Sequence, residues 1–214
     1  STGSAGSVGS EVVFEGAIEH ADATYDTNAN KIVFCYKDDA NSDYGTAIVG
    51  TISGSSISFG TPVVYSSINT DQNHATFDSS NNKVVFSYYK NNVDTMHCIV
   101  GTVSGTSISF GSETQFGTTG VYNNITFDSS NNKVVVVYRD NANSSQGTAK
   151  VGTVSGTSIS FGSATVFMTG NAYQAINATF DSSNNKVVVL SSDYNDSHTL
   201  KVKVGTVSGT SISF

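Results

Sequence analysis

Apolar and polar positions alternate in short runs along the chain, and turn-forming residues separate these runs. One stretch shows the pattern clearly, with strand-like runs at residues 124–128, 133–140, 148–154 and 158–167. The β-branched second run is typical of a strand buried on both faces, and Gly162 predicts a kink within the fourth run. Helical periodicity is absent throughout. The pattern therefore predicts an all-β unit of four strands.

This unit occurs four times. The string Phe-Asp-Ser-Ser-Asn-Asn-Lys-Val-Val begins at Phe77, Phe127 and Phe180, with a looser version at Tyr25, and a Val-Gly-Thr motif recurs at spacings of 51, 51 and 53 residues. A period near 50 residues is typical of propeller blades and other repeat arrays. We predict a four-bladed β-propeller with four antiparallel strands in each blade. A solenoid and a sandwich are the alternatives.

The two ends of the chain carry complementary parts of one repeat. The last copy ends at Phe214, whereas the inner copies continue into a further apolar strand, and residues 9–14 supply the missing continuation. We therefore expect the ring to close by pairing of the N-terminal strand within the C-terminal blade, beside residues 211–214. Residues 1–10 are interpreted as a flexible linker or a cloning remnant attached to a domain cut from a larger protein. Residues 11–214 then form one propeller.

Charge and composition exclude several classes of partner. The formal net charge is −7 with ten Lys and Arg residues, which gives no electrostatic footprint for nucleic acid or anionic lipid. No apolar run reaches the roughly 18 residues of a membrane helix, and no secretion signal is visible. Cys35 and Cys98 align with small or apolar residues of the other copies, as packed thiols do. A disulfide between them stays open as an alternative.

The four copies differ mainly in one set of loops. In a propeller, the turns between strands one and two and between strands three and four share a face, and these turns are nearly identical among the copies. The connections on the opposite face diverge and carry most of the loop tyrosines and all four histidines. Binding residues concentrate on such loops, although longer loops also drift freely. The candidate ligand-binding residues on this face are Asp39, Tyr44, His74, Tyr122, Asn123, Arg139, Tyr173, Tyr194 and His198.

Catalytic and metal motifs are weak or missing. Residues 39–45 superficially resemble a calcium loop, but the glycine comes one position late and the twelfth-position glutamate is absent. The histidines lack the paired spacing of a zinc site. Asp38, Asp140 and Asp193 share an aligned position and either face one another across a funnel or cap turns. We expect no enzyme activity, no cofactor and no metal.

The repeated Phe-Asp-Ser-Ser-Asn-Asn-Lys-Val-Val, followed by Val-Gly-Thr-Val-Ser-Gly-Thr-Ser-Ile-Ser-Phe-Gly, resembles repeats of tail-fibre-like and other virion structural proteins of bacteriophages, particularly marine ones. The resemblance covers residues 11–214. It implies an extracellular or virion-surface domain that recognises a host-surface glycan or protein through the variable loops. The alternatives are a structural spacer or docking domain for another virion protein, and a polysaccharide-active enzyme.

Overall fold

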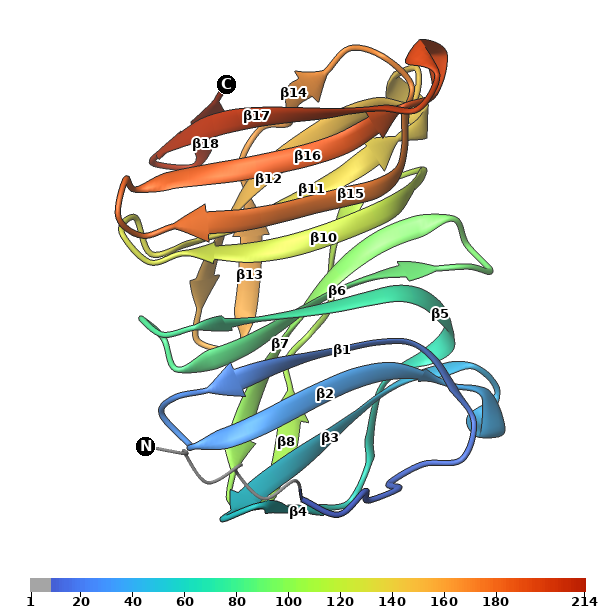
Figure 1. Cartoon of the computed structure of the whole chain (residues 1–214), viewed down its shortest axis with the longest axis vertical. Coiled ribbons are helices and arrows are strands. Elements are labelled where there is room, and N and C mark those ends of the chain that lie inside the picture. Colours follow the sequence, from blue (N-terminus) through green and yellow to red (C-terminus); the bar gives the residue numbers. More distant parts are fainter. Residues whose placement is uncertain (1–8) are drawn as a thin grey trace, which may run out of the picture.

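The computed structural model describes residues 9–214 and consists of antiparallel strands connected by turns and three short 3-10 helices. Four repeat units of four strands follow one another along the chain (Figure 1). Unit 1 contains β1 (Ile18–Asp26), β2 (Lys31–Asp38), β3 (Tyr44–Ser53) and β4 (Ser56–Phe59), and unit 2 contains β5 (Val63–Asp78), β6 (Lys83–Lys90), β7 (Thr95–Ser104) and β8 (Ser107–Phe110). Unit 3 contains β10 (Gly120–Asp128), β11 (Lys133–Asp140), β12 (Gln146–Ser155) and β13 (Ser158–Phe161), and unit 4 contains β15 (Ala172–Asp181), β16 (Lys186–Asp193), β17 (Thr199–Ser208) and β18 (Ser211–Ser213).

The repeated Asp-Ser-Ser-Asn-Asn string forms the hairpin between the first two strands of a unit. In unit 3, the carboxylate of Asp128 accepts hydrogen bonds from the amides of Ser130 and Asn131, both at 3.0 Å. Asn132 then takes the left-handed conformation, with φ 54°, that asparagine tolerates better than most residues. The side chain of the aspartate thus holds the turn, which explains why the string is repeated almost unchanged.

Three further strand segments join successive units. The first part of β5 pairs with β3, while β9 (Thr114–Gly117) pairs with β7 and β14 (Thr165–Met168) pairs with β12. The predicted fourth strand over residues 158–167 is therefore two strands, β13 and β14, and the break includes Gly162. These pairings give sheets of nine, five and four strands. Each junction segment continues the outer edge of one unit and leads into the next.

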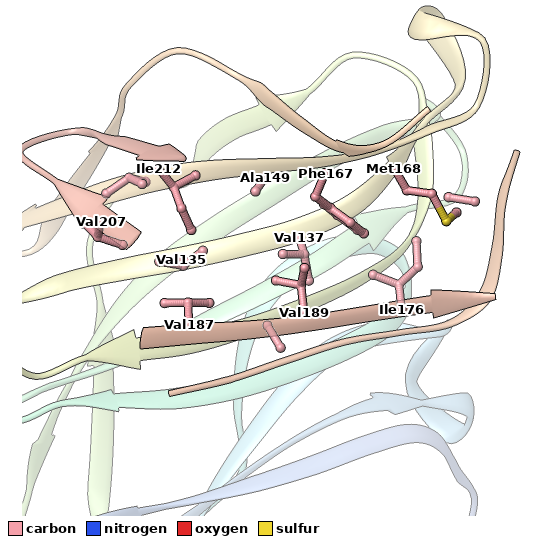
Figure 2. Close-up of a cluster of buried hydrophobic side chains, with 13 residues drawn as sticks. Val135, Val137, Ala149, Phe167, Met168, Ile176, Val187, Val189, Val207 and Ile212 are labelled. Atoms are coloured by element: carbon pink, nitrogen blue, oxygen red, sulfur yellow. The ribbon is translucent and has the colours of Figure 1, made fainter. Parts of the chain in front are cut away.

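The hydrophobic cores lie between successive units. Alternate residues of the second and third strands of one unit pack against the second strand of the next, and an aromatic residue of the junction segment fills the space between them. Figure 2 shows the core between units 3 and 4, where Phe167 lies among Val135, Val137 and Val189. The equivalent junction aromatics are Tyr65 and Phe116. Each unit therefore depends on its neighbour to bury its apolar face.

The four units form an open row. The first strand of each unit is called its inner strand. Contacts between inner strands link β1 with β5, β5 with β10, and β10 with β15. Figure 1 shows the start of the described chain beside unit 1 at one end of the long axis and Phe214 beside unit 4 at the other. The prediction that the termini meet to close a ring is wrong for this structure. The all-β architecture of antiparallel four-stranded repeats is confirmed.

The N-terminal segment packs on unit 1. The ring of Phe14 lies 4.8 Å from Phe59 and 5.6 Å from both Phe34 and Tyr36, measured between centroids. Gly9 fits against the Ser55 carbonyl so closely that a Cβ would lie 2.0 Å from its oxygen, and Gly60, Gly111 and Gly162 approach the next unit in the same way. The predicted pairing of residues 12–14 with residues 211–214 is therefore wrong. The N-terminal segment packs on unit 1 in the way that each junction segment packs on the unit that follows it.

Both cysteines are fully buried free thiols, which confirms their interpretation as packing residues. Within residues 9–214 there is no helix of the length and apolar character needed to cross a bilayer. The predicted linker lies mostly in residues 1–8, outside the described residues.

Candidate functional site

The inner strand of every unit contains a β-bulge at the same height, near the variable loops. The registers of β1, β5, β10 and β15 all shift there, and each bulge holds one non-glycine residue with positive φ. These residues are His20 (47°), Gln72 (52°), Tyr122 (54°) and Ala175 (53°). Left-handed non-glycine residues cost on the order of 1 kcal/mol or more and concentrate, with bulges, near functional sites. The bulges therefore direct attention to this end of the inner strands.

A row of polar side chains crosses the inner strands just after the bulges. Asp22, His74 and Asn124 occupy equivalent positions in units 1, 2 and 3. Nδ1 of His74 lies 3.5 Å from Oδ2 of Asp22 and 3.4 Å from Nδ2 of Asn124. Asp22 also accepts from the amide of Ala75 at 3.0 Å, and Asn124 accepts from the amide of Ala178 at 3.2 Å. The row thus connects all four units.

The environment of Asp22 keeps its carboxyl ionised. Burial acts to raise the pKa of Asp22, but the hydrogen bond with His74 and those from the amides of Ala75 and Ala23 outweigh it and lower the pKa. A carboxylate that stays charged beside a histidine can accept a proton or a hydroxyl hydrogen bond from a ligand.

A charged cluster lies beside this row in units 1 and 2. Nζ of Lys37 is 3.1 Å from Glu19 and 3.7 Å from both Asp43 and Asp71, with Asp39 at 3.9 Å. Burial acts to lower the pKa of Lys37, but Glu19, Asp71 and Asp43 raise it overall. Nε2 of His20 lies 3.3 Å from Oδ1 of Asp71. The cluster is a dense set of hydrogen-bonding groups with an excess of negative charge.

Units 3 and 4 present an aromatic cluster on the same face. Tyr173 lies at its centre, with ring centroids 5.8 Å from Tyr122, 5.4 Å from Tyr194 and 5.2 Å from His198. Tyr194 and His198 pack edge to face at 5.2 Å. Tyr194 is 53% exposed, so the cluster presents an aromatic surface to solvent. Tyr122 belongs to unit 3 and the other three residues to unit 4, so the junction between these units completes the cluster.

The aligned aspartates at the ends of the second strands have a structural role. Asp38, Asp140 and Asp193 each cap a 3-10 helix, namely η1 (Asp39–Asn41), η2 (Asn141–Asn143) and η3 (Tyr194–Asp196). Their carboxylates accept from backbone amides at 3.0–3.1 Å. Of the two interpretations offered by the sequence, the structure supports turn capping. The calcium-like segment 39–45 includes η1, and no group of three or more His, Cys, Asp or Glu residues within 9–214 is arranged to hold a metal ion.

The structure divides the predicted ligand-binding residues among different environments. Tyr122, Tyr173, Tyr194 and His198 come together in the aromatic cluster, and His74 belongs to the polar row. Asp39 lies at the edge of the Lys37 cluster. Tyr44 begins β3 on the same loop face and is half-buried. Arg139 lies opposite Val121 in β11 and donates to Ser145 at 3.0 Å.

Asn123 is buried between units 2 and 3. Its side chain donates to the carbonyl of Gln72 at 2.9 Å and accepts from the hydroxyl of Ser87 at 2.6 Å. The residue is 2% exposed, and its two side-chain hydrogen bonds connect units 2 and 3.

Sequence reasoning did not single out Glu19, Asp22, Lys37 and Asp71. Alignment of the copies could have identified them, because Asp22 aligns with His74 and Asn124, and Glu19 aligns with Asp71. Such a row of polar residues in the middle of an inner strand is the signal that was available.

Comparisons with known proteins show a likeness of fold. No family model matches the chain, and no curated protein is similar to it. An exo-β-1,3-galactanase from Clostridium thermocellum superposes with a TM-score of 0.59 at 10% identity, covering 95% of this chain and 48% of that chain. The exo-β-1,3-galactanase of Phanerochaete chrysosporium with galactose gives a TM-score of 0.54 at 10% identity, covering 90% of this chain and 49% of that chain. The chain thus spans about half the length of these enzymes.

The expectation that the chain is not an enzyme is contradicted by this comparison, because the solved structures of similar fold include exo-β-1,3-galactanases. Absence of the motifs searched for in the sequence was insufficient evidence, since acid and base residues can be distributed over several repeats. At this identity the likeness shows the fold alone, and the all-β repeat array is therefore a propeller-like arrangement.

Proposed function

We propose that this chain binds a glycan on the variable-loop face, with the aromatic cluster Tyr122, Tyr173, Tyr194 and His198 as its main contact surface. The observation that carries the proposal is the convergence of four rings within 5.2–5.8 Å from two units, with Tyr194 exposed. Aromatic rings offer sugars an apolar surface together with polar groups for hydroxyl hydrogen bonds.

The neighbouring polar row and Lys37 cluster provide the hydrogen-bonding partners that a sugar needs. Asp22 and Asn124 offer acceptors, and Asn124 and Lys37 offer donors. The galactanases of similar fold were solved with galactose and β-1,3-galactotriose, which makes these sugars the first ligands to test.

The binding test compares the aromatic cluster with a matched surface position. A glycan array identifies ligands, and calorimetry then measures the affinity of the native chain and of Tyr173→Ala and Tyr194→Ala. We expect each variant to lose about tenfold or more, since an aromatic contact contributes about 0.5–1.5 kcal/mol beyond its buried area. Ile52→Ala, at a 58% exposed position of β3 beside the β3–β4 turn on the opposite face, is the control and should bind normally. A folded chain that binds no glycan, or binds equally without these rings, would refute the proposal.

The resemblance of the repeats to phage virion proteins supports an external setting, in which the glycan belongs to a host surface. The competing structural role is docking to another virion protein through the same loops. Binding of the purified chain to host cells, lost in Tyr194→Ala, would separate host recognition from docking.

A second candidate function is glycan hydrolysis. The specific observation is the pairing of His74 with Asp22 and of His20 with Asp71 on the inner strands, because paired acids and bases can move protons. Release of reducing sugar from β-1,3-galactan should then fall in Asp22→Asn and Asp71→Asn, whereas Asp196→Asn in the exposed turn η3 should keep the activity. No turnover by the native chain would leave binding alone.

A further inference from the structure

The two ends of the row carry the two halves of one more unit-to-unit junction. In units 1 to 3, the apolar face of the third strand is covered by the next unit, so that Val49, Val100 and Val151 are at most 1% exposed. In unit 4, the equivalent face of β17 is open, and Leu200, Val202 and Val204 are 56–57% exposed. We call these three residues the trailing face.

The backbone edge of β17 is open in the same place. β3, β7 and β12 each pair there with a junction segment, namely the first part of β5, β9 and β14. Among the described residues, β17 pairs only with β16 and β18. An exposed apolar strand with a free edge is a template for pairing with another chain.

The N-terminal segment is the matching half. Residues 9–15 have the sequence and position of a junction segment: Gly9 approaches Ser55, and Phe14 packs on Phe34 and Phe59 of unit 1. Among the described residues the segment nevertheless has no strand pairing. The leading side of unit 1 is open as well, where Tyr25 is 47% exposed and its equivalents Phe77, Phe127 and Phe180 pack against cores.

We propose that the trailing face of one copy of this chain binds residues 9–15 and unit 1 of a second copy, head to tail. The junction continues the arrangement already made three times within the chain. The two ends lie at opposite ends of the long axis, which favours a second copy over closure within one chain (Figure 1). A head-to-tail contact uses different surfaces on the two partners, so it propagates to a ring or a filament.

The N-terminal segment and the internal junction after unit 2 carry a glutamate at the same position. In the junction after unit 2, Glu113 pairs with Lys90, accepts from the Tyr88 hydroxyl at 2.8 Å and lies 3.9 Å from His97. By alignment, Glu11 takes the place of Glu113, and Lys201 takes the place of His97. Beside Lys201 the surface is hollowed into a groove of about 480 Å³ whose lining includes Phe167, Asp193 and Val202. The proposed junction brings Glu11 of the second copy to this groove, where Lys201 already pairs with Asp193 at 2.8 Å and with Asp196 at 3.1 Å.

The internal register predicts which residues meet. Thr165 faces Ala149 in the β12–β14 pair, so Val12 of one copy faces Val202 of the other. Facing Cα atoms in an antiparallel pair are about 4.5–5.5 Å apart, within reach of a disulfide. Cys35 and Cys98 are fully buried and do not compete.

Disulfide trapping tests the junction directly. An oxidised mixture of the single variants Val12→Cys and Val202→Cys should give a band at twice the chain mass of 22.3 kDa, and neither variant alone should do so. Val12→Cys mixed with Thr206→Cys, a position paired with β18, is the out-of-register control. No trapped dimer, or equal trapping in the control, would overturn the proposal. A double variant Val12→Cys/Val202→Cys that gives only an internally crosslinked monomer would overturn it in favour of ring closure.

Sedimentation velocity supplies an independent measurement. The weight-average mass of the native chain should rise above 22.3 kDa with concentration, and Val202→Asp should stay at that mass. Val93→Asp, a similarly exposed valine in the β6–β7 loop, should associate like the native chain. A native chain that remains monomeric at the highest soluble concentration would show that the trailing face is unoccupied. Circular dichroism of all variants confirms that they are folded.

Discussion

Replacing Asn123 by Ala tests whether side-chain hydrogen bonds hold successive units together. The Asn123 amide donates to the Gln72 carbonyl at 2.9 Å and accepts from the Ser87 hydroxyl at 2.6 Å, and both Asn123 and Ser87 are buried. The alanine variant leaves that carbonyl and that hydroxyl without these partners, while the backbone amide of residue 123 still donates to the side-chain oxygen Oε1 of Gln72.

The expected cost follows from the two groups that are left unpaired. A buried polar group without a partner costs about 1–3 kcal/mol, so Asn123→Ala should lower the free energy of unfolding by about 2–6 kcal/mol. For a domain of this size, 1 kcal/mol corresponds to about 2–4 °C in melting temperature. A loss of about 3 kcal/mol therefore predicts a decrease of about 6–12 °C by calorimetry.

A double-mutant cycle with Ser87→Ala isolates the bond across the units. Removing the hydroxyl from the Asn123→Ala variant also removes an unpaired donor, so the double variant should be more stable than the sum of the single losses predicts. The exposed Asn195→Ala is the control and should change the free energy of unfolding by less than about 0.5 kcal/mol. Additive losses, or an unchanged melting temperature in Asn123→Ala, would refute the reasoning. Glycan affinity of the folded variant should be unchanged.

Three further predictions concern buried groups. Burial raises the pKa of Cys35 and Cys98, so both thiols should resist alkylation at pH 8 in the native chain and react after unfolding, as mass spectrometry would show; rapid native labelling would contradict their burial. Burial also raises the pKa of several tyrosines, so the unfolded chain ionises first and stability should fall as the pH rises above about 10; a urea-unfolding series at pH 8–11 checks this, and constant stability would exclude it. The tyrosines concerned are Tyr36, Tyr65, Tyr88 and Tyr138. Asp128→Ala should cost about 1–3 kcal/mol, because the hairpin amides of Ser130 and Asn131 lose their acceptor; calorimetry should detect a loss that Asp196→Ala does not show.

The repeat pattern predicted the strands well because local chemistry decides them. The predicted run and the observed strand β11 have the same bounds, Lys133 and Asp140. The β-branched residues favour the strand, and Asp140 caps the turn that follows it. The first strand was predicted too short. β10 begins at Gly120, because the bulge at Tyr122 interrupts the alternation by which a strand is recognised, while the pairing with β11 continues beyond it.

The site was less accessible to sequence because its residues meet only through packing. The four aromatic residues were all among the candidates, but their spacing along the chain does not indicate that Tyr173 contacts residues of both units. Asn123 shows the opposite case. It lies next to Tyr122 in sequence, and the bulge turns adjacent residues in different directions, so that Tyr122 joins the cluster and Asn123 is buried. Position on the variable-loop face therefore did not distinguish a residue of the aromatic cluster from a buried residue that links two units.

The prediction of ring closure failed for a related reason. In sequence, residues 9–15 correspond to the junction segments that pair with the third strands of units 1 to 3. In the structure Phe14 packs on unit 1, and Val202 on β17 is exposed. The match between the two ends of the sequence does not give the angle between successive units. That angle decides whether the fourth unit returns to the first. With an open row, the same match acts between chains. The surface that would have closed a ring then becomes the surface through which copies associate.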